Sequence, residues 1–160
     1  MQQDVISTLN DPRLLEAREY HMDRLTRLFD GEELGEPFRL RGYAGRSERD
    51  AVTDPEGWVR DCLADLAEHA ELLLDRKVFR PLCTENWLYG VHFMDRVFGA
   101  EVRCRDGLFW SFGVENEIGE LPVPDLEHDP TWSAARRLAL ALVGSGAKVP
   151  FISTQVLGEP

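Results

Sequence analysis

The sequence has few basic residues and no long apolar run, and each shortage argues against a class of protein. Lys and Arg number 18 against 29 Asp and Glu, which gives a formal net charge of −11. Because phosphate contacts need a basic surface, this balance argues against a general nucleic-acid binder. It leaves room for a local basic pocket. No apolar run approaches the ~20 residues that cross a bilayer, so we expect no membrane partner.

Signal-peptide features and paired cysteines are also lacking. The N-terminal "MQQDVISTLNDPR" has no charged start with an apolar stretch behind it. The three cysteines, Cys62, Cys83 and Cys104, are widely spaced. This pattern favours reduced thiols in a cytoplasmic protein over a disulfide framework. The remaining composition, 43% hydrophobic and 29% charged, is typical of a globular chain, and 160 residues predict one domain.

Three helices are predicted from their first residues and their apolar spacing. Each begins with an N-cap aspartate followed by a first-turn proline. These aspartates are Asp11, Asp54 and Asp129. Apolar residues at helical spacing extend the helices over residues 12–29, 55–75 and 131–143. A shorter helix is expected over residues 85–99, closed by Gly99.

Short strands are predicted between these helices, at residues 38–43, 77–83 and 149–156. A strand and helix order of this kind indicates parallel strands, adjacent in that order, with two of the helices on one face. "EVRCR" and "LFWSF", joined by Asp106 and Gly107, predict a β-hairpin over residues 101–112. We expect the hairpin to lie outside the sheet, as an insertion.

A cluster of arginines is the first candidate for a binding site. Arg39, Arg41, Arg46 and Arg49 fall within eleven residues of an otherwise acidic chain. Arg41 and Arg46 flank a glycine turn at the carboxyl end of the first expected strand, where parallel α/β proteins bind ligands. Guanidinium groups bind carboxylates and phosphates with two hydrogen bonds, which predicts an anionic small-molecule ligand. The alternative is that these arginines pair with the nearby acids Glu32, Glu33, Glu36, Glu48 and Asp50.

A second candidate is "CTENW", at the end of the second expected strand. Glu85 could serve there as a catalytic acid or base. The alternative is that Thr84 caps the next helix and Glu85 lies on its first turn. The polar residues that end the third strand are expected at the same edge, and they are Ser153, Thr154 and Gln155. His92 is interpreted as a packed or surface residue, and we expect neither a metal nor a cofactor.

Four stretches, taken in order, resemble the uroporphyrinogen decarboxylase superfamily. "RGYAGR" is similar to the Arg-Gln-Ala-Gly-Arg loop of that family, and "DPEGWVRDCLADL" to the Ser-Pro-Glu opening of its next helix. "VHFMDRVFGAEV" and "AKVPFISTQVLGEP" resemble its Leu-Gly-(Met/Ala)-Glu-Val and Arg-Val-Pro-Leu-Ile-Gly-Phe stretches. The order and spacing fit from Phe38 to Pro160.

The resemblance implies an α/β fold, the N-terminal part of a TIM (β/α)8 barrel with about three of its eight strands. Residues 1–37 would then be an N-terminal helix and loop, and residues 38–160 the barrel strands with the hairpin as an insertion. The chain would be an N-terminal piece. It would self-associate through the edge at residues 149–156, or bind a polypeptide that completes the barrel.

The sequence departs from the family at its functional residues. The family's arginine loop has one residue fewer between its arginines than separate Arg41 and Arg46, so only Arg46 carries over. The aspartate of the decarboxylases would fall at Gly90, and the nearest acid at that strand end is Glu85. The family also includes cobalamin-linked methyltransferases, whose zinc ligands lie in a second half without a counterpart here.

These observations predict a protein that binds a carboxylate-rich or other anionic small molecule and is inactive as a single chain. Two alternatives remain open. The first is part of a cobalamin-dependent methyltransferase-like barrel. The second is a non-catalytic α/β module that binds a ligand or a partner.

Overall fold

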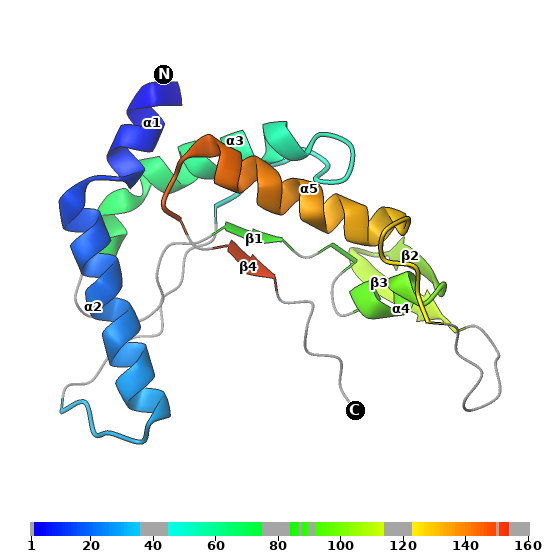
Figure 1. The fold of residues 1–160 in the computed structure, drawn as a ribbon, viewed down its shortest axis with the longest axis horizontal. Helices are drawn as coiled ribbons and strands as arrows, with labels where there is room; N and C mark the ends of the chain where they lie inside the picture. Colours follow the sequence, from blue (N-terminus) through cyan, green and yellow to red (C-terminus); the bar gives the residue numbers. More distant parts are fainter. Residues whose placement is uncertain are drawn as a thin grey trace.

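Helices make up most of the ordered elements in the computed structural model of this chain (Figure 1). The structure describes residues 2–35, 45–74, 84–86, 88–89, 92–113, 123–149 and 151–153. The helices are α1 (Gln2–Leu9), α2 (Pro12–Phe29), α3 (Pro55–Glu68), the 3-10 helix η1 (Ala70–Leu74), α4 (Phe93–Val97) and α5 (Pro130–Ser145). The strands are β1 (Thr84–Asn86), β2 (Glu101–Arg105), β3 (Leu108–Phe112) and β4 (Phe151–Ser153).

The three Asp-Pro helix starts are confirmed at α2, α3 and α5. Each aspartate accepts a hydrogen bond from a backbone N–H of the first turn, for example Asp54 from Gly57 at 3.0 Å. Such a bond satisfies one of the N–H groups that a helix start leaves unpaired. The expected helix 55–75 is divided at His69, where α3 gives way to η1. Helix α1 was not predicted.

The core lies between helices. In Figure 1, α3 and α5 run side by side above the short strands, and α1 crosses one end of α3. Cys62 and Leu66 of α3 and Leu138 of α5 are fully or almost fully buried, as are Leu9 and Leu73. Burial raises the pKa of the Cys62 thiol to about 12, so it stays protonated and packs as a small apolar side chain.

The expectation of a TIM-barrel fragment is wrong. The described strands form two separate two-stranded sheets rather than one sheet of three parallel strands. β1 and β4 do pair in parallel, but over only three residues, with Thr84 opposite Phe151 and Asn86 opposite Ser153. The apolar faces of α1, α3 and α5 pack largely against one another, so the core is helix on helix. The expected strands 38–43 and 77–83 lie outside the described residues.

The start of the expected helix 85–99 is also corrected. Thr84 to Asn86 form β1, and α4 begins only at Phe93. The proposed cap role of Thr84 is therefore wrong, and Thr84 is instead a fully buried strand residue. Tyr89 lies between the two elements with a left-handed φ of 58°, a backbone conformation that no helix can continue through.

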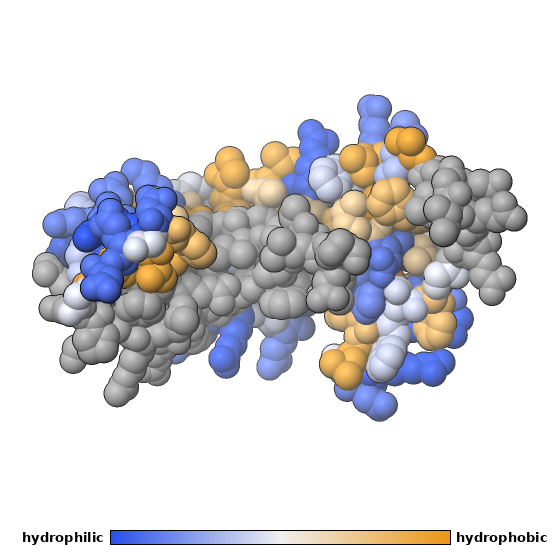
Figure 2. All heavy atoms as spheres, turned by 90° about the horizontal axis from the view of Figure 1, so that it is seen from below, coloured by the Kyte–Doolittle hydropathy of each residue, from blue (hydrophilic) through white to orange (hydrophobic). Residues whose placement is uncertain are grey.

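The hairpin prediction is confirmed. β2 and β3 pair antiparallel with Arg105 opposite Leu108, and the turn residues Asp106 and Gly107 have φ of 53° and 77°. Two positive φ values define a type I′ turn, whose twist matches that of the strands. The hairpin is separate from the β1–β4 pair. Figure 2 shows hydrophobic and hydrophilic residues interspersed at this end of the molecule.

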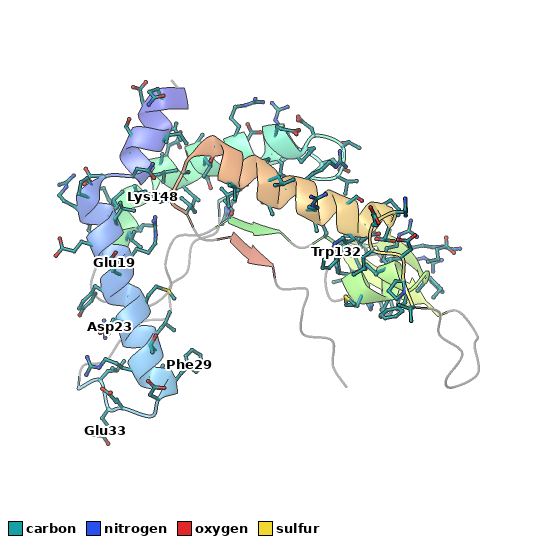
Figure 3. All side chains as sticks on the ribbon, in the orientation of Figure 1. Glu19, Asp23, Phe29, Glu33, Trp132 and Lys148 are labelled. Carbon is teal, nitrogen blue, oxygen red and sulfur yellow. The ribbon has the colours of Figure 1, made fainter. Side chains whose placement is uncertain are left out.

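Hydrogen bonds join the corner between α1 and α2 to the segment that follows α5. The side-chain amide of Asn10, between α1 and α2, donates to the Gly146 carbonyl at 2.9 Å and accepts from the Lys148 N–H at 2.8 Å. The Arg18 guanidinium also donates to the Lys148 carbonyl. Figure 3 shows Lys148 beside the upper end of α2, while Glu19, Asp23 and Phe29 mark the part of α2 that extends away from the body. Among the described helices, none combines the length and apolarity needed to cross a membrane.

Candidate functional site

A hollow of about 1010 Å³ opens between the loop of residues 45–53, the first turns of α3 and the hairpin. Its size is at the upper end of the range typical of small-molecule sites. The residues that line it are Gly45, Arg46, Ser47, Glu48, Asp50, Ala51, Val52, Thr53, Trp58, Asp61, Leu88, Tyr89 and Phe109. Residues 45–61, 88–89 and 109, which are separated in the sequence, therefore meet at one surface.

The loop is held against α3 at its first residues. A Cβ atom on Gly45 would lie 2.5 Å from the Cys62 carbonyl oxygen and 2.9 Å from Leu66 Cγ, so this backbone approach requires glycine. The next residue, Arg46, donates its backbone N–H to Asp65 Oδ2 at 2.9 Å. These two contacts fix the backbone from which the exposed Arg46 side chain projects.

Arg49 joins the loop to the start of α3. Its Nη1 lies 2.8 Å from Asp54 Oδ2, and its Nε lies 2.7 Å from Asp61 Oδ2, which also accepts from the Ser47 hydroxyl at 3.2 Å. The Arg49 hydrogen bond lowers the pKa of Asp54, helped by the Gly57 N–H. The alternative interpretation, in which the arginines pair with acids, thus holds for Arg49. Its partners, however, are Asp54 and Asp61 rather than the acids expected from the sequence.

The far end of the loop is a tight turn that α5 also contacts. Asp50 accepts from the Thr53 N–H at 3.0 Å and the Val52 N–H at 2.7 Å, and these bonds lower its pKa. Arg137 of α5 donates to the Val52 carbonyl at 2.8 Å. The loop is therefore attached to two helices by contacts within the chain.

Aromatic side chains form the opposite part of the lining. Trp58 is buried at the start of α3. Tyr89 and Phe109 meet edge to face with ring centroids 6.1 Å apart, and the Arg96 guanidinium lies over the Tyr89 ring at 5.8 Å. Rings arranged in this way offer flat apolar surface beside the polar loop.

The predicted site residues fall into three groups. Arg46 lines the hollow. Glu85 and Ser153 lie on the paired strands β1 and β4, where Glu85 is opposite Ile152. Arg41, Thr154 and Gln155 lie outside the described residues, as does Arg39. The structure thus places one of the predicted residues in the hollow.

The aromatic residues of the hollow were missed by the sequence analysis. Trp58 lies four residues after the N-cap Asp54. The apolar spacing of α3 predicts only that such a residue packs in the core. Tyr89 and Phe109 become neighbours only because the hairpin folds back toward Tyr89. The periodicity of a single element carries no signal for such a long-range contact.

Metal-binding side chains do not gather in the part of the chain that is described. No three His, Cys, Asp or Glu residues lie close enough there to hold an ion. His92 Nδ1 lies 2.8 Å from Asp95 Oδ2 of the same helix start. Cys104 is an exposed free thiol of the hairpin, and Cys83 lies outside the described residues.

Comparisons with protein-family models, with curated proteins and with solved structures found no match to this chain. The resemblance to the uroporphyrinogen decarboxylase superfamily therefore stays a prediction from the sequence.

Proposed function

We propose that this chain binds a small organic molecule that carries carboxylates on an apolar body, and that it does so in the hollow beside Arg46. The observation that carries the proposal is the meeting of Arg46 with Trp58, Tyr89 and Phe109 in one open hollow. A guanidinium group can hold a carboxylate with two parallel hydrogen bonds. The aromatic rings can then cover the apolar part of the same molecule.

Two acidic residues of the lining, Asp50 and Asp61, are engaged with the protein itself. Asp61 accepts from Arg49 and from Ser47, and Asp50 accepts from two backbone N–H groups of its own turn. Charges that are already compensated repel an approaching anion less than open carboxylates do. Glu48 is exposed to solvent, where water and salt screen it.

The family resemblance supports carboxylates as the ligand chemistry. Arg46 is the arginine that matches the arginine loop of the uroporphyrinogen decarboxylase superfamily, whose name describes a reaction on a carboxylate-bearing substrate. The proposal concerns binding, and it assigns no turnover to Glu85.

Substitution of Arg46 tests the proposal. Pyromellitate, an aromatic tetracarboxylate, serves as the probe in calorimetric titration. Arg46→Lys keeps the positive charge but loses the forked pair of donors. We expect the affinity to fall by about tenfold or more, since hydrogen bonds to charged groups contribute about 1.5–3 kcal/mol.

Arg136→Lys is the matched control, because Arg136 is an exposed arginine on α5 outside the hollow. Benzamide, an uncharged aromatic amide, is the matched ligand control. The proposal requires that only Arg46→Lys weakens pyromellitate binding and that benzamide binds much more weakly to the unaltered chain. Equal affinity of the two arginine variants would refute it.

A further inference from the structure

The outer strand of the hairpin combines exposed apolar side chains with a backbone edge that has no partner among the described residues. Leu108, Trp110 and Phe112 alternate along β3, so they share one face, and they are 62%, 54% and 42% exposed. Arg103 lies over the Phe112 ring at 4.9 Å and pairs with Glu101, so charged groups border this apolar row. A surface with Trp and Phe at its centre and Arg at its rim is typical of protein interfaces.

The register of the hairpin shows which backbone groups point outward. In a two-residue hairpin, the residues that flank the turn form a hydrogen-bonded pair, here Arg105 and Leu108, and the pairs then alternate. The N–H and C=O groups of Phe109 and Ser111 therefore point away from β2. They make no backbone hydrogen bond to any other described residue. Helix α4 contacts β2, on the inner side of the hairpin.

Such an edge is a template for another strand. Natural proteins protect exposed edges with Lys, Pro, bulges or a covering element. β3 reads Leu-Phe-Trp-Ser-Phe and has neither Lys nor Pro. Its composition therefore favours pairing with a strand from elsewhere.

We propose that β3 pairs antiparallel with β3 of a second copy of this chain, about a two-fold axis at Trp110. The outward N–H and C=O groups of Phe109 then form hydrogen bonds with those of Ser111 in the second copy. Ser111 pairs with Phe109 of the second copy in the same way. Trp110 faces its own counterpart in a non-hydrogen-bonded pair, and Leu108 faces Phe112 of the second copy. Leu108, Trp110 and Phe112 of both copies lie on one face of the resulting four-stranded sheet, so each apolar side chain faces another apolar side chain.

The charge of the hairpin supports a second copy as the occupant. The whole chain carries −11, so two copies repel each other over most of their surfaces. In residues 101–112, however, Arg103 and Arg105 balance Glu101 and Asp106, and β3 itself has no charge. The hairpin is thus a surface where two acidic chains can meet with little repulsion.

The size of the contact sets its expected strength. Pairing two five-residue strands covers an area at the small end of protein interfaces. We therefore expect reversible dimers in the micromolar range rather than permanent ones. Salt should strengthen the dimer, because it screens the repulsion between the two −11 chains while leaving the apolar contact intact.

Sedimentation velocity over a range of concentrations tests the dimer with two variants. Trp110→Lys would place two like charges opposite each other at the axis, and Ser111→Pro removes an outward N–H while an edge strand tolerates proline. Leu140→Lys on α5 is the matched control, since Leu140 is 57% exposed and lies far from the hairpin in the sequence. We expect the unaltered chain and Leu140→Lys to dimerise, more so in salt, and both β3 variants to stay monomeric.

Cysteine cross-linking tests the axis itself. Cα atoms of a non-hydrogen-bonded pair lie about 4.5 Å apart, within the range that a disulfide spans. In a Cys104→Ser background, Trp110→Cys should oxidise to a linked dimer, whereas Val143→Cys, exposed on α5, should not. A concentration-independent monomer for the unaltered chain overturns the proposal. Association that persists in both β3 variants, or equal cross-linking at positions 110 and 143, overturns it as well.

Discussion

At the scale of single residues, the hollow depends on close contacts that only particular side chains permit. Gly45 brings the loop backbone against the Cys62 carbonyl, and Arg49 bridges the carboxylates of the N-cap Asp54 and of Asp61 on α3. Together with the hydrogen bond from the Arg46 N–H to Asp65, these contacts fix the backbone of Arg46 beside the hollow. The sequence identified Arg46 from its neighbours alone, whereas the role of Gly45 follows only from the packing of α3.

Replacement of Gly45 by alanine should destabilise the fold. The added Cβ would meet the Cys62 carbonyl and the Leu66 side chain, and relief of such crowding typically costs about 1–3 kcal/mol. Urea unfolding monitored by circular dichroism measures the change. Gly144→Ala is the matched control, since nothing lies within 4 Å of its added Cβ and alanine favours a helix, so its midpoint should stay or rise. Equal midpoints for the two variants would contradict the packing account.

At the scale of elements, capping residues and turn residues allowed helix starts and the hairpin turn to be predicted from the sequence. The starts of α2, α3 and α5 and the two-residue turn of the hairpin are local, and the sequence predicted all four. The start of α4 was misread, because β1 owes its strand form to pairing with β4, some 65 residues away in the chain. Pairing over such a distance leaves little trace in a short stretch of sequence.

The aspartates at the starts of α2 and α3, and Asp50 in the loop turn, predict how stability depends on pH. The pKa values of Asp11, Asp50 and Asp54 lie below the ordinary 3.8, mainly through Arg13, the Thr53 N–H and Arg49 respectively. A lowered pKa in the folded state means that the unfolded chain binds protons first. The stabilisation is therefore fully present above pH 3.8, the ordinary pKa. It is lost as the pH falls through the lower pKa values of the folded state.

Urea midpoints at about pH 5 and about pH 3 measure this loss. The unaltered chain should be clearly less stable at the lower pH. Asp50→Asn should be less stable than the unaltered chain at the higher pH and should show a smaller difference between the two. An identical pH dependence in this variant would mean that the turn at Asp50 contributes nothing to it.

At the scale of the whole molecule, helices rather than a sheet form the core. The barrel expectation treated strands and helices as alternating layers, but α3 packs on α5 and on α1, and each described sheet has two strands. Apolar periodicity predicts that a helix has a buried face and does not say what that face is buried against. The hollow arises because this helical body meets a loop and a hairpin.

The most direct test of the proposed function locates the ligand. Amide and indole resonances of the ¹⁵N-labelled chain are followed by nuclear magnetic resonance during titration with pyromellitate. We predict saturable shifts at Arg46, Ser47, Tyr89 and Phe109 and at the Trp58 indole, because these groups line the hollow. Resonances of the far half of α2, such as that of Phe29, should not move. Shifts confined to residues outside the hollow, or no saturable shift at all, would contradict the account.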